Sequence, residues 1–302
     1  MELQELYPKL KNIPLIAKNI VEGFLSGLHR SPHHGFSVEF AEHRDYFSGD
    51  PLRHVDWKVY GRTDKMYIKK YEEETNVRSY FLLDISSSMQ YKGSSKWNKL
   101  EYAALLMASL GYLAQKQIDG IAYGYFSNSL KSISPVKSTN TQLNQMIVSL
   151  EEQLQGIGKK KEATDLNNSL SNLANIINKR SLIYIISDFL IDPEALRKTK
   201  DLLLELKHLK HEIILISVHD FKTEIDFDFD DGNYTFEDLE SDLKLNLRSQ
   251  DIKEVYKKQM NAHISSLKEF CNLHKIDLLL ADISSNPEEI LKNYLINRTK
   301  MM

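Results

Sequence analysis

The sequence lacks the residues that mark several classes of protein. A single cysteine, Cys271, among 302 residues excludes an intramolecular disulfide framework and a cysteine-rich zinc site. No apolar run approaches the roughly 18 residues that a membrane-spanning helix needs. The first 24 residues also contain no basic region followed by an unbroken apolar stretch. We therefore expect a cytoplasmic protein with no transmembrane segment.

An excess of basic charge is also missing. The 39 Lys and Arg residues are set against 42 Asp and Glu residues, which gives a formal net charge of −3. Residues 39–78 hold several arginines among aromatic residues, but their eight basic residues are outnumbered by nine acidic ones. Without a basic stripe to neutralise phosphates, we expect no nucleic-acid partner.

From residue 79 onward, short apolar runs alternate with long amphipathic stretches. The apolar runs lie at 79–85, 120–126, 182–187, 212–218 and 276–281. Helical patterns lie between and after them, at about 97–117, 142–155, 167–178, 193–209, 250–274 and 287–297. This alternation predicts right-handed crossovers and therefore an α/β fold with a doubly wound, mainly parallel sheet.

The residues before this alternation follow a different pattern. From Pro14 to Leu28 the apolar residues recur at helical spacing, which predicts an amphipathic helix docked on the protein's own core. Residues 36–78 mix aromatic residues with dense charge of both signs, and we expect short strands and loops there. The predicted organisation is an N-terminal accessory segment at 1–78 followed by the α/β domain at 79–302.

Oxygen-bearing side chains follow the predicted strands where a doubly wound sheet binds its ligands. Asp84, Ser86 and Ser88 alternate at the end of the first strand, Thr164 stands in the loop before a helix, and Asp188 follows the run at 182–187. Asp and Ser are also common in strand-end turns and helix caps. Carboxylates and hydroxyls without Cys or His nevertheless suit a hard divalent cation, so we predict a site for Mg²⁺ or Mn²⁺.

These five residues resemble the metal-ion-dependent adhesion site of von Willebrand factor type A domains. Asp84, Ser86 and Ser88 match the first loop of that site, Thr164 the second and Asp188 the third. The resemblance implies that the metal joins this protein to an acidic residue of another protein. Two carboxylates leave a +2 ion poorly neutralised, so a partner carboxylate would be a favourable further ligand.

An upstream pattern resembles the signature of the bacterial domain of unknown function 58 family, whose members place it before a type A domain. The residues that carry it are Phe40, Glu42, His43, Arg44, Asp45, Tyr46, Gly49, Asp50, Arg53, His54, Asp56, Trp57, Lys58, Arg62, Thr63 and Asp64. The pattern Phe236-x-Asp238-x-Glu240 resembles a weaker family element. The resemblance implies a protein partner, a MoxR-type AAA+ ATPase or its client.

Together these observations predict a metal-dependent protein-interaction module that is not an enzyme. The alternative is a Mg²⁺-dependent phosphohydrolase using the same site, with Asp84 as nucleophile. Such enzymes usually carry a second carboxylate two residues on as general acid, and Ser86 stands there instead. The acidic stretch 226–242 has carboxylates spaced as in a calcium loop. Counted from Asp226, however, Gly232 stands at the seventh position, whereas a calcium loop requires glycine at the sixth, so we expect a solvated acidic loop.

Overall fold

The structure, a computed structural model, describes residues 13–28, 43–45, 57–63, 65–69, 77–156, 161–177 and 180–301. These residues fall into two compact units. One lies within Met1–Phe24 and Val77–Met302, and the other lies within Leu25–Asn76.

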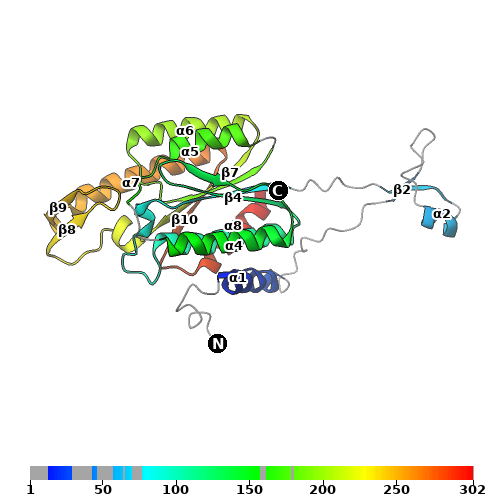
Figure 1. Cartoon of the computed structure of the whole chain (residues 1–302), viewed down its shortest axis with the longest axis horizontal. Helices are drawn as coiled ribbons and strands as arrows, with labels where there is room; N and C mark the ends of the chain where they lie inside the picture. The colour runs from blue at the N-terminus through cyan, green and yellow to red at the C-terminus, as the bar shows by residue number, and fades with distance from the viewer. Residues whose placement is uncertain are drawn as a thin grey trace. The chain divides into compact units, whose positions relative to one another are not determined.

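A six-stranded sheet forms the centre of the larger unit (Figure 1). Its strand order is β10-β7-β6-β3-β4-β5, and every neighbouring pair is parallel except β4 with β5. The strands are β3 (Arg78–Asp84), β4 (Gly120–Phe126), β5 (Leu130–Ile133), β6 (Leu182–Ser187), β7 (Glu212–His219) and β10 (Asp277–Asp282). The predicted doubly wound, mainly parallel sheet is confirmed, and the short antiparallel edge strand β5 is an addition to it.

Helices cover both faces of this sheet (Figure 1). One face carries α1 (Ile13–Leu28), α3 (Lys99–Lys116), α4 (Asn140–Gln155) and α8 (Pro287–Met301). The other face carries α5 (Leu166–Ile176), α6 (Pro193–His208) and α7 (Ser249–His274). Alternate residues of β3 feed the two cores, because successive strand side chains point to opposite faces. Phe81 therefore packs on the α3 side and Leu82 on the α5 side.

Helix α3 is the most deeply buried helix next to the sheet, and its start is defined by a capping box. The Asn98 side chain accepts from the Glu101 amide, and the Glu101 side chain accepts from the Asn98 amide. These two bonds satisfy amides that the first helical turn leaves free. They begin the helix at Lys99, whose side chain is 1% exposed. A charged side chain is thus enclosed at the carboxyl edge of the sheet.

The N-terminal helix α1 packs on the apolar core of the larger unit, to which most of it belongs, as predicted. Ile13, Ile16, Ala17 and Ile20 are buried in the same apolar cluster as the side chains of α3 and α8. Their spacing of three and four residues places them on one face of the helix. Among the described residues, no helix combines the length and the apolar character that crossing a bilayer requires.

The smaller unit contains three short elements. Strand β1 (His43–Asp45) pairs antiparallel with β2 (Tyr67–Lys69), and α2 spans Trp57–Thr63. The strands agree with the expectation for residues 36–78, whereas the helix was not expected. The other residues of the family signature lie outside the described residues: Phe40, Glu42, Tyr46, Gly49, Asp50, Arg53, His54, Asp56 and Asp64.

The acidic stretch at 226–242 keeps most of its carboxylates exposed, as predicted, but part of it forms a strand of a hairpin and is not a loop. It follows a π-helical turn, η5 (Phe221–Ile225), and leads into a hairpin of β8 (Asn233–Glu237) and β9 (Lys244–Arg248). Phe227 is only 3% exposed and contacts the rings of Phe229, Phe236 and Tyr256. Alternating aromatic and acidic residues let the rings cluster while the carboxylates face solvent, which is why composition alone was misleading.

Candidate functional site

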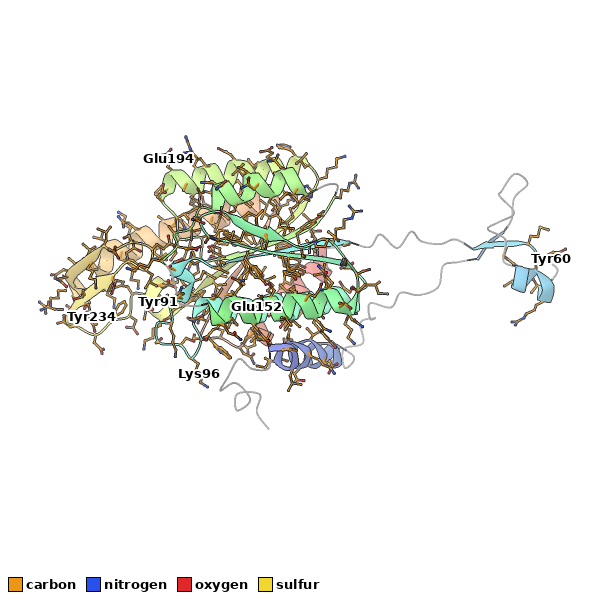
Figure 2. All side chains as sticks on the ribbon, viewed as in Figure 1. Tyr60, Tyr91, Lys96, Glu152, Glu194 and Tyr234 are labelled. Atoms are coloured by element: carbon orange, nitrogen blue, oxygen red, sulfur yellow. The ribbon has the colours of Figure 1, made fainter. Side chains whose placement is uncertain are left out.

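Three buried aspartates lie where neighbouring strands of the sheet end. Asp84 is the last residue of β3, Asp188 follows β6 and Asp220 follows β7. Their exposed fractions are 0%, 2% and 0%. Because β3, β6 and β7 are adjacent and parallel, these residues share one edge of the sheet. Figure 2 labels Tyr91 at this edge and Tyr234 on the β8–β9 hairpin beyond it.

The loop after β3 brings two predicted ligands together. The Oγ atoms of Ser86 and Ser88 lie 3.1 Å apart. Asp84 holds this loop in place, since its Oδ1 accepts from the Ser86 amide at 2.9 Å. Its Oδ2 accepts from the Ser187 hydroxyl at 2.6 Å. The structure therefore places a pair of hydroxyl oxygens beside a buried carboxylate.

Thr164 is carried to this loop by the segment 161–165. The Ser87 amide donates to the Glu162 carbonyl at 2.9 Å, and the Glu162 amide donates to the Ser87 hydroxyl at 2.8 Å. Thr164 itself bonds to Glu240, between β8 and β9. Its hydroxyl donates to Glu240 Oε1 at 2.9 Å and its amide to Oε2 at 3.1 Å. In the described part of the chain, Thr164 thus engages a carboxylate of the hairpin.

Asp188 is paired with a buried lysine that the sequence analysis did not identify. Lys99 Nζ lies 2.7 Å from Asp188 Oδ2 and 2.7 Å from Glu224 Oε1. Asp188 Oδ1 accepts from the Leu190 amide at 3.1 Å. Glu224 belongs to the π-helical turn η5, and its Oε2 accepts from the Asp220 amide at 2.8 Å. The lysine therefore joins the ends of β6 and β7.

Burial and neighbouring charges separate the proton affinities of the two aspartates. Burial, followed by the nearby charge of Asp188, raises the pKa of Asp84 to about 7. Burial would also raise the pKa of Asp188, but the charge and hydrogen bond of Lys99 keep it below its usual value. Burial and then Lys99 lower the pKa of His219 to about 4. Asp84 is therefore a carboxylate that a further cation would stabilise.

The loop after η4 (Ser87–Gln90) closes over Asp220. Asp220 Oδ2 accepts from the Ser94 amide at 2.9 Å and from the Thr223 hydroxyl at 2.8 Å. Gly93 has a φ of +53°, and a Cβ there would lie 1.7 Å from Asp220 Oδ2, so only glycine fits. An open hollow of about 480 Å³ lies between this loop and the hairpin, lined in part by Tyr91 and Leu239.

The chemistry of these donors fits a hard divalent cation. Four buried carboxylates share this edge with a single buried ammonium, that of Lys99, among the residues described here: Asp84, Asp188, Asp220 and Glu224. Lys99 is already paired with Asp188 and Glu224, so Asp84 has no cation of its own, and the Ser86 and Ser88 hydroxyls offer neutral oxygens beside it. Both oxygens of Asp84 and of Asp188 already accept hydrogen bonds, so these side chains suit contact with a cation through water.

Sequence reasoning missed Lys99, Glu224 and Asp220 and gave Glu240 no part in the site. Lys99 lies in the first turn of an amphipathic helix, where a lysine is usually solvated. Glu240 did carry a signal, because it ends the pattern Phe236-x-Asp238-x-Glu240. That pattern is part of the family resemblance. In the structure its last residue, Glu240, accepts a hydrogen bond from the Thr164 hydroxyl.

Comparison with known proteins places this chain in a family. The family model described as "Protein of unknown function DUF58" matches residues 42–266. Uncharacterized proteins of Mycobacterium bovis and Mycobacterium tuberculosis are 23% identical over 238 residues, which is 78% of this chain and 72% of each relative. The family match itself covers all five predicted ligands.

Solved structures with a similar arrangement were also found. BatB of Bacteroides thetaiotaomicron is 14% identical, with a TM-score of 0.44, over 74% of this chain and 99% of that one. A von Willebrand factor type A protein of Catenulispora acidiphila is 10% identical, with a TM-score of 0.35, over 48% and 34% of the two chains. The manganese-loaded TRAP protein of Plasmodium vivax is 13% identical, with a TM-score of 0.35, over 47% and 57%. With its signature and the match over 42–266, the chain belongs to the DUF58 family, and its larger unit has a doubly wound, mainly parallel sheet.

Proposed function

We propose that this protein is a metal-dependent protein-interaction module. In this proposal Ser86 and Ser88 bind Mg²⁺ or Mn²⁺ directly, while Asp84, Asp188 and Thr164 complete the site, the two aspartates through water. The bound cation would supply an open position for a carboxylate of a partner protein. The chain's own residues hold the hydroxyls in place, keep the carboxylates buried and present the loop at the edge of the sheet.

The convergence of Ser86 and Ser88 beside buried Asp84 carries this proposal. Hydroxyl oxygens that bind one small cation must lie close together, and the 3.1 Å separation meets that requirement. Asp84 lies within this loop with a pKa raised to about 7 by burial and then by Asp188, so its ionised form lacks a compensating cation. A divalent ion would supply that compensation without displacing Lys99 from Asp188 and Glu224.

The interaction proposal accounts for these residues better than the phosphohydrolase alternative does. A nucleophilic carboxylate must reach a substrate phosphorus atom, whereas Asp84 is fully buried and both its oxygens accept hydrogen bonds. Ser86, two residues on, has no ionisable proton to give to a leaving group at neutral pH. We therefore assign the site to binding rather than to turnover.

The partner that we propose is a MoxR-type AAA+ ATPase or its client, as the family resemblance implies. The open hollow of about 480 Å³ beside the loop offers room for the chain that flanks the partner's acidic residue. Tyr91 and Leu239 line this hollow, and aromatic and apolar side chains are typical of such contacts.

The test is the binding of a purified MoxR-type AAA+ ATPase from the same genome, measured in Mg²⁺ and in EDTA. We expect binding only in Mg²⁺, and we expect Asp84→Ala and Ser86→Ala to abolish it. Ser79→Ala is the matched control, because Ser79 is a buried serine near the opposite end of β3. Direct Mn²⁺ binding, followed by electron paramagnetic resonance, should be lost in the same two variants and kept in the control.

Two results would contradict the proposal. One is ATPase binding that persists unchanged in EDTA, and the other is Mn²⁺ binding that Asp84→Ala leaves intact. Hydrolysis of a phosphoester that requires Mg²⁺ and disappears in Asp84→Ala would instead favour the phosphohydrolase.

A further inference from the structure

The turn between β8 and β9, residues 238–243, will be called the acidic tip. It carries three carboxylates, Asp238, Glu240 and Asp242. Two of them are exposed, and only Glu240 is half-buried. Glu240 is turned toward the candidate site, where Thr164 donates both its hydroxyl and its amide to the Glu240 carboxylate, at 2.9 and 3.1 Å. A carboxylate of this chain thus already accepts hydrogen bonds from Thr164, one of the predicted metal ligands.

The acidic tip is shaped before any partner arrives. The Asp238 amide donates to the Leu243 carbonyl at 2.9 Å, which closes the turn. Asp238 Oδ1 accepts from the Glu240 amide at 3.0 Å, and the Ser241 hydroxyl donates to the same carboxylate. Such local bonds pre-organise a turn. Glu240 is therefore presented on a folded loop, as an acidic residue of a partner would be.

The contacts between Lys161 and the tip are exposed, whereas the two bonds from Thr164 are partly buried. Besides the two bonds from Thr164, Lys161 Nζ contacts the Ser241 carbonyl at 3.0 Å and Asp242 Oδ1 at 2.8 Å. The Lys161 and Asp242 side chains are 46% and 97% exposed. Ion pairs that water reaches this freely add little to stability. The restraint that Lys161 places on the tip is therefore weak.

We propose that the acidic tip is an internal occupant of the partner's binding position. In the free protein Glu240 engages Thr164 and closes the site, and a partner carboxylate binds only when it displaces Glu240. This inference rests on the proposed metal-dependent function. It adds that Glu240 competes with the partner. A partner carboxylate must therefore bind the site more tightly than Glu240 does, or be present at a higher local concentration.

The experiment uses the full chain as wild type, Glu240→Ala and Glu240→Gln. Asp242→Asn is the matched control, because it removes a tip carboxylate that contacts Lys161 and not Thr164. The first measurement is hydrogen exchange of the Thr164 amide, whose acceptor is Glu240 Oε2. We expect this exchange to become faster in the Glu240 variants and to stay unchanged in Asp242→Asn, with or without Mg²⁺.

The second measurement uses a fluorescent synthetic peptide with the sequence of residues 237–243 as the probe. A tethered group competes at an effective concentration in the millimolar range, so removing Glu240 should tighten peptide binding by at least about tenfold. We expect Glu240→Ala to bind the peptide in Mg²⁺ and not in EDTA, and the wild type and Asp242→Asn to bind it weakly. A peptide with Gln in place of Glu240 should bind to none of them.

The outcomes separate this inference from the function on which it rests. If wild type and Glu240→Ala bind the peptide equally in Mg²⁺, the internal occupant is overturned and the metal-dependent site stands. If no variant binds the peptide in Mg²⁺ and none binds Mn²⁺, both are overturned. An unchanged Thr164 amide in Glu240→Ala would overturn the internal occupant alone.

Discussion

Two lysines in this protein each contact two acidic side chains, and their surroundings give them different roles. Lys99 lies 2.7 Å from Asp188 and from Glu224, with a side chain that is 1% exposed. Lys161 lies 2.8 Å from Asp242, within reach of Glu237 at 3.8 Å, and is 46% exposed. The shortest distance in each set is nearly the same, so distance alone does not separate them.

Burial separates the two lysines because water weakens only the exposed pairs. A pair in a low-dielectric interior cannot lose one member without leaving the other charge unsolvated. A pair at the surface is solvated whether or not it forms. Lys99 therefore fixes the ends of β6 and β7, while Lys161 only restrains the acidic tip. At the candidate site, the ends of β6 and β7 are therefore held by a buried ion pair, whereas the acidic tip is held in part by exposed ones.

Lys99→Met should have the largest effect, since it leaves Asp188 and Glu224 buried without their cation. We expect the free energy of unfolding to fall by about 3–5 kcal/mol, the usual cost of removing one member of a buried pair. Urea denaturation in EDTA measures this loss, with Lys161→Met as the control. A loss no larger than that of the control would show that burial does not distinguish the two lysines.

Mg²⁺ should stabilise the folded protein through the loop that carries Ser86 and Ser88, and not through the acidic tip. At a free concentration of about 100 times its dissociation constant, a ligand of the folded state adds about 2.7 kcal/mol. We expect this gain in thermal or urea unfolding of the wild type and of Ser79→Ala. The double variant Ser86→Ala/Ser88→Ala should gain nothing. An equal gain in the double variant would place the cation elsewhere.

The raised pKa of Asp84 should make the stability of the metal-free protein depend on pH. Burial and then Asp188 raise its pKa from 3.8 to about 7, so between these values the folded state binds the proton that the unfolded state has lost. Stability must then fall as pH rises through this range. From pH 6 to pH 8 the loss from this group should be on the order of 1 kcal/mol.

The Asp84→Asn variant isolates this contribution. His219, whose pKa burial and then Lys99 lower to about 4, acts in the opposite direction between pH 4 and 6.5, but it is present in both proteins. Urea denaturation in EDTA at pH 6 and pH 8 should therefore show a smaller pH-dependent loss in Asp84→Asn. Added Mg²⁺ should oppose the loss in the wild type, because metal binding requires the ionised carboxylate. Equal pH dependence in both proteins would contradict the assignment to Asp84.

Lys161→Met should have the smallest effect. We expect no measurable change in the urea midpoint, because its partners remain solvated when it is removed. Amides of the acidic tip should nevertheless exchange faster, since Lys161 restrains Ser241 and Asp242. Hydrogen exchange of residues 238–243 checks this. A clear loss of global stability would mean that the tip is part of the folded core.

Most of the larger unit could be read from apolar periodicity. The predicted runs at 120–126 and 182–187 coincide with β4 and β6, and the pattern at about 193–209 with α6. Strand β5 was missed because two of its four residues are exposed, the other two are half-buried, and they form no apolar run. The β8–β9 hairpin was missed because acidic residues between the aromatics concealed a cluster that forms through tertiary contacts.

The candidate site was predictable only in the part that is local in sequence. Asp84, Ser86 and Ser88 follow one strand, and the convergence of the two hydroxyls follows from their spacing. Thr164 and Asp188 were placed from the order of elements. Their hydrogen-bond partners were not predicted, because Lys99 is 89 residues from Asp188 and Glu240 is 76 residues from Thr164.

Linear pattern was enough to predict the alternation of strands and helices, the edge of the sheet at which the candidate site lies, and the family. Each of these depends on periodicity, short-range spacing or a motif, which a linear pattern contains. The folded chain alone shows that Lys99 is buried between Asp188 and Glu224 while Lys161 stays in solvent, and that Glu240 engages Thr164. Burial and long-range pairing depend on how separate elements pack. The ion pairs of the two lysines therefore contribute differently to stability only because that packing encloses Lys99 and leaves Lys161 in solvent.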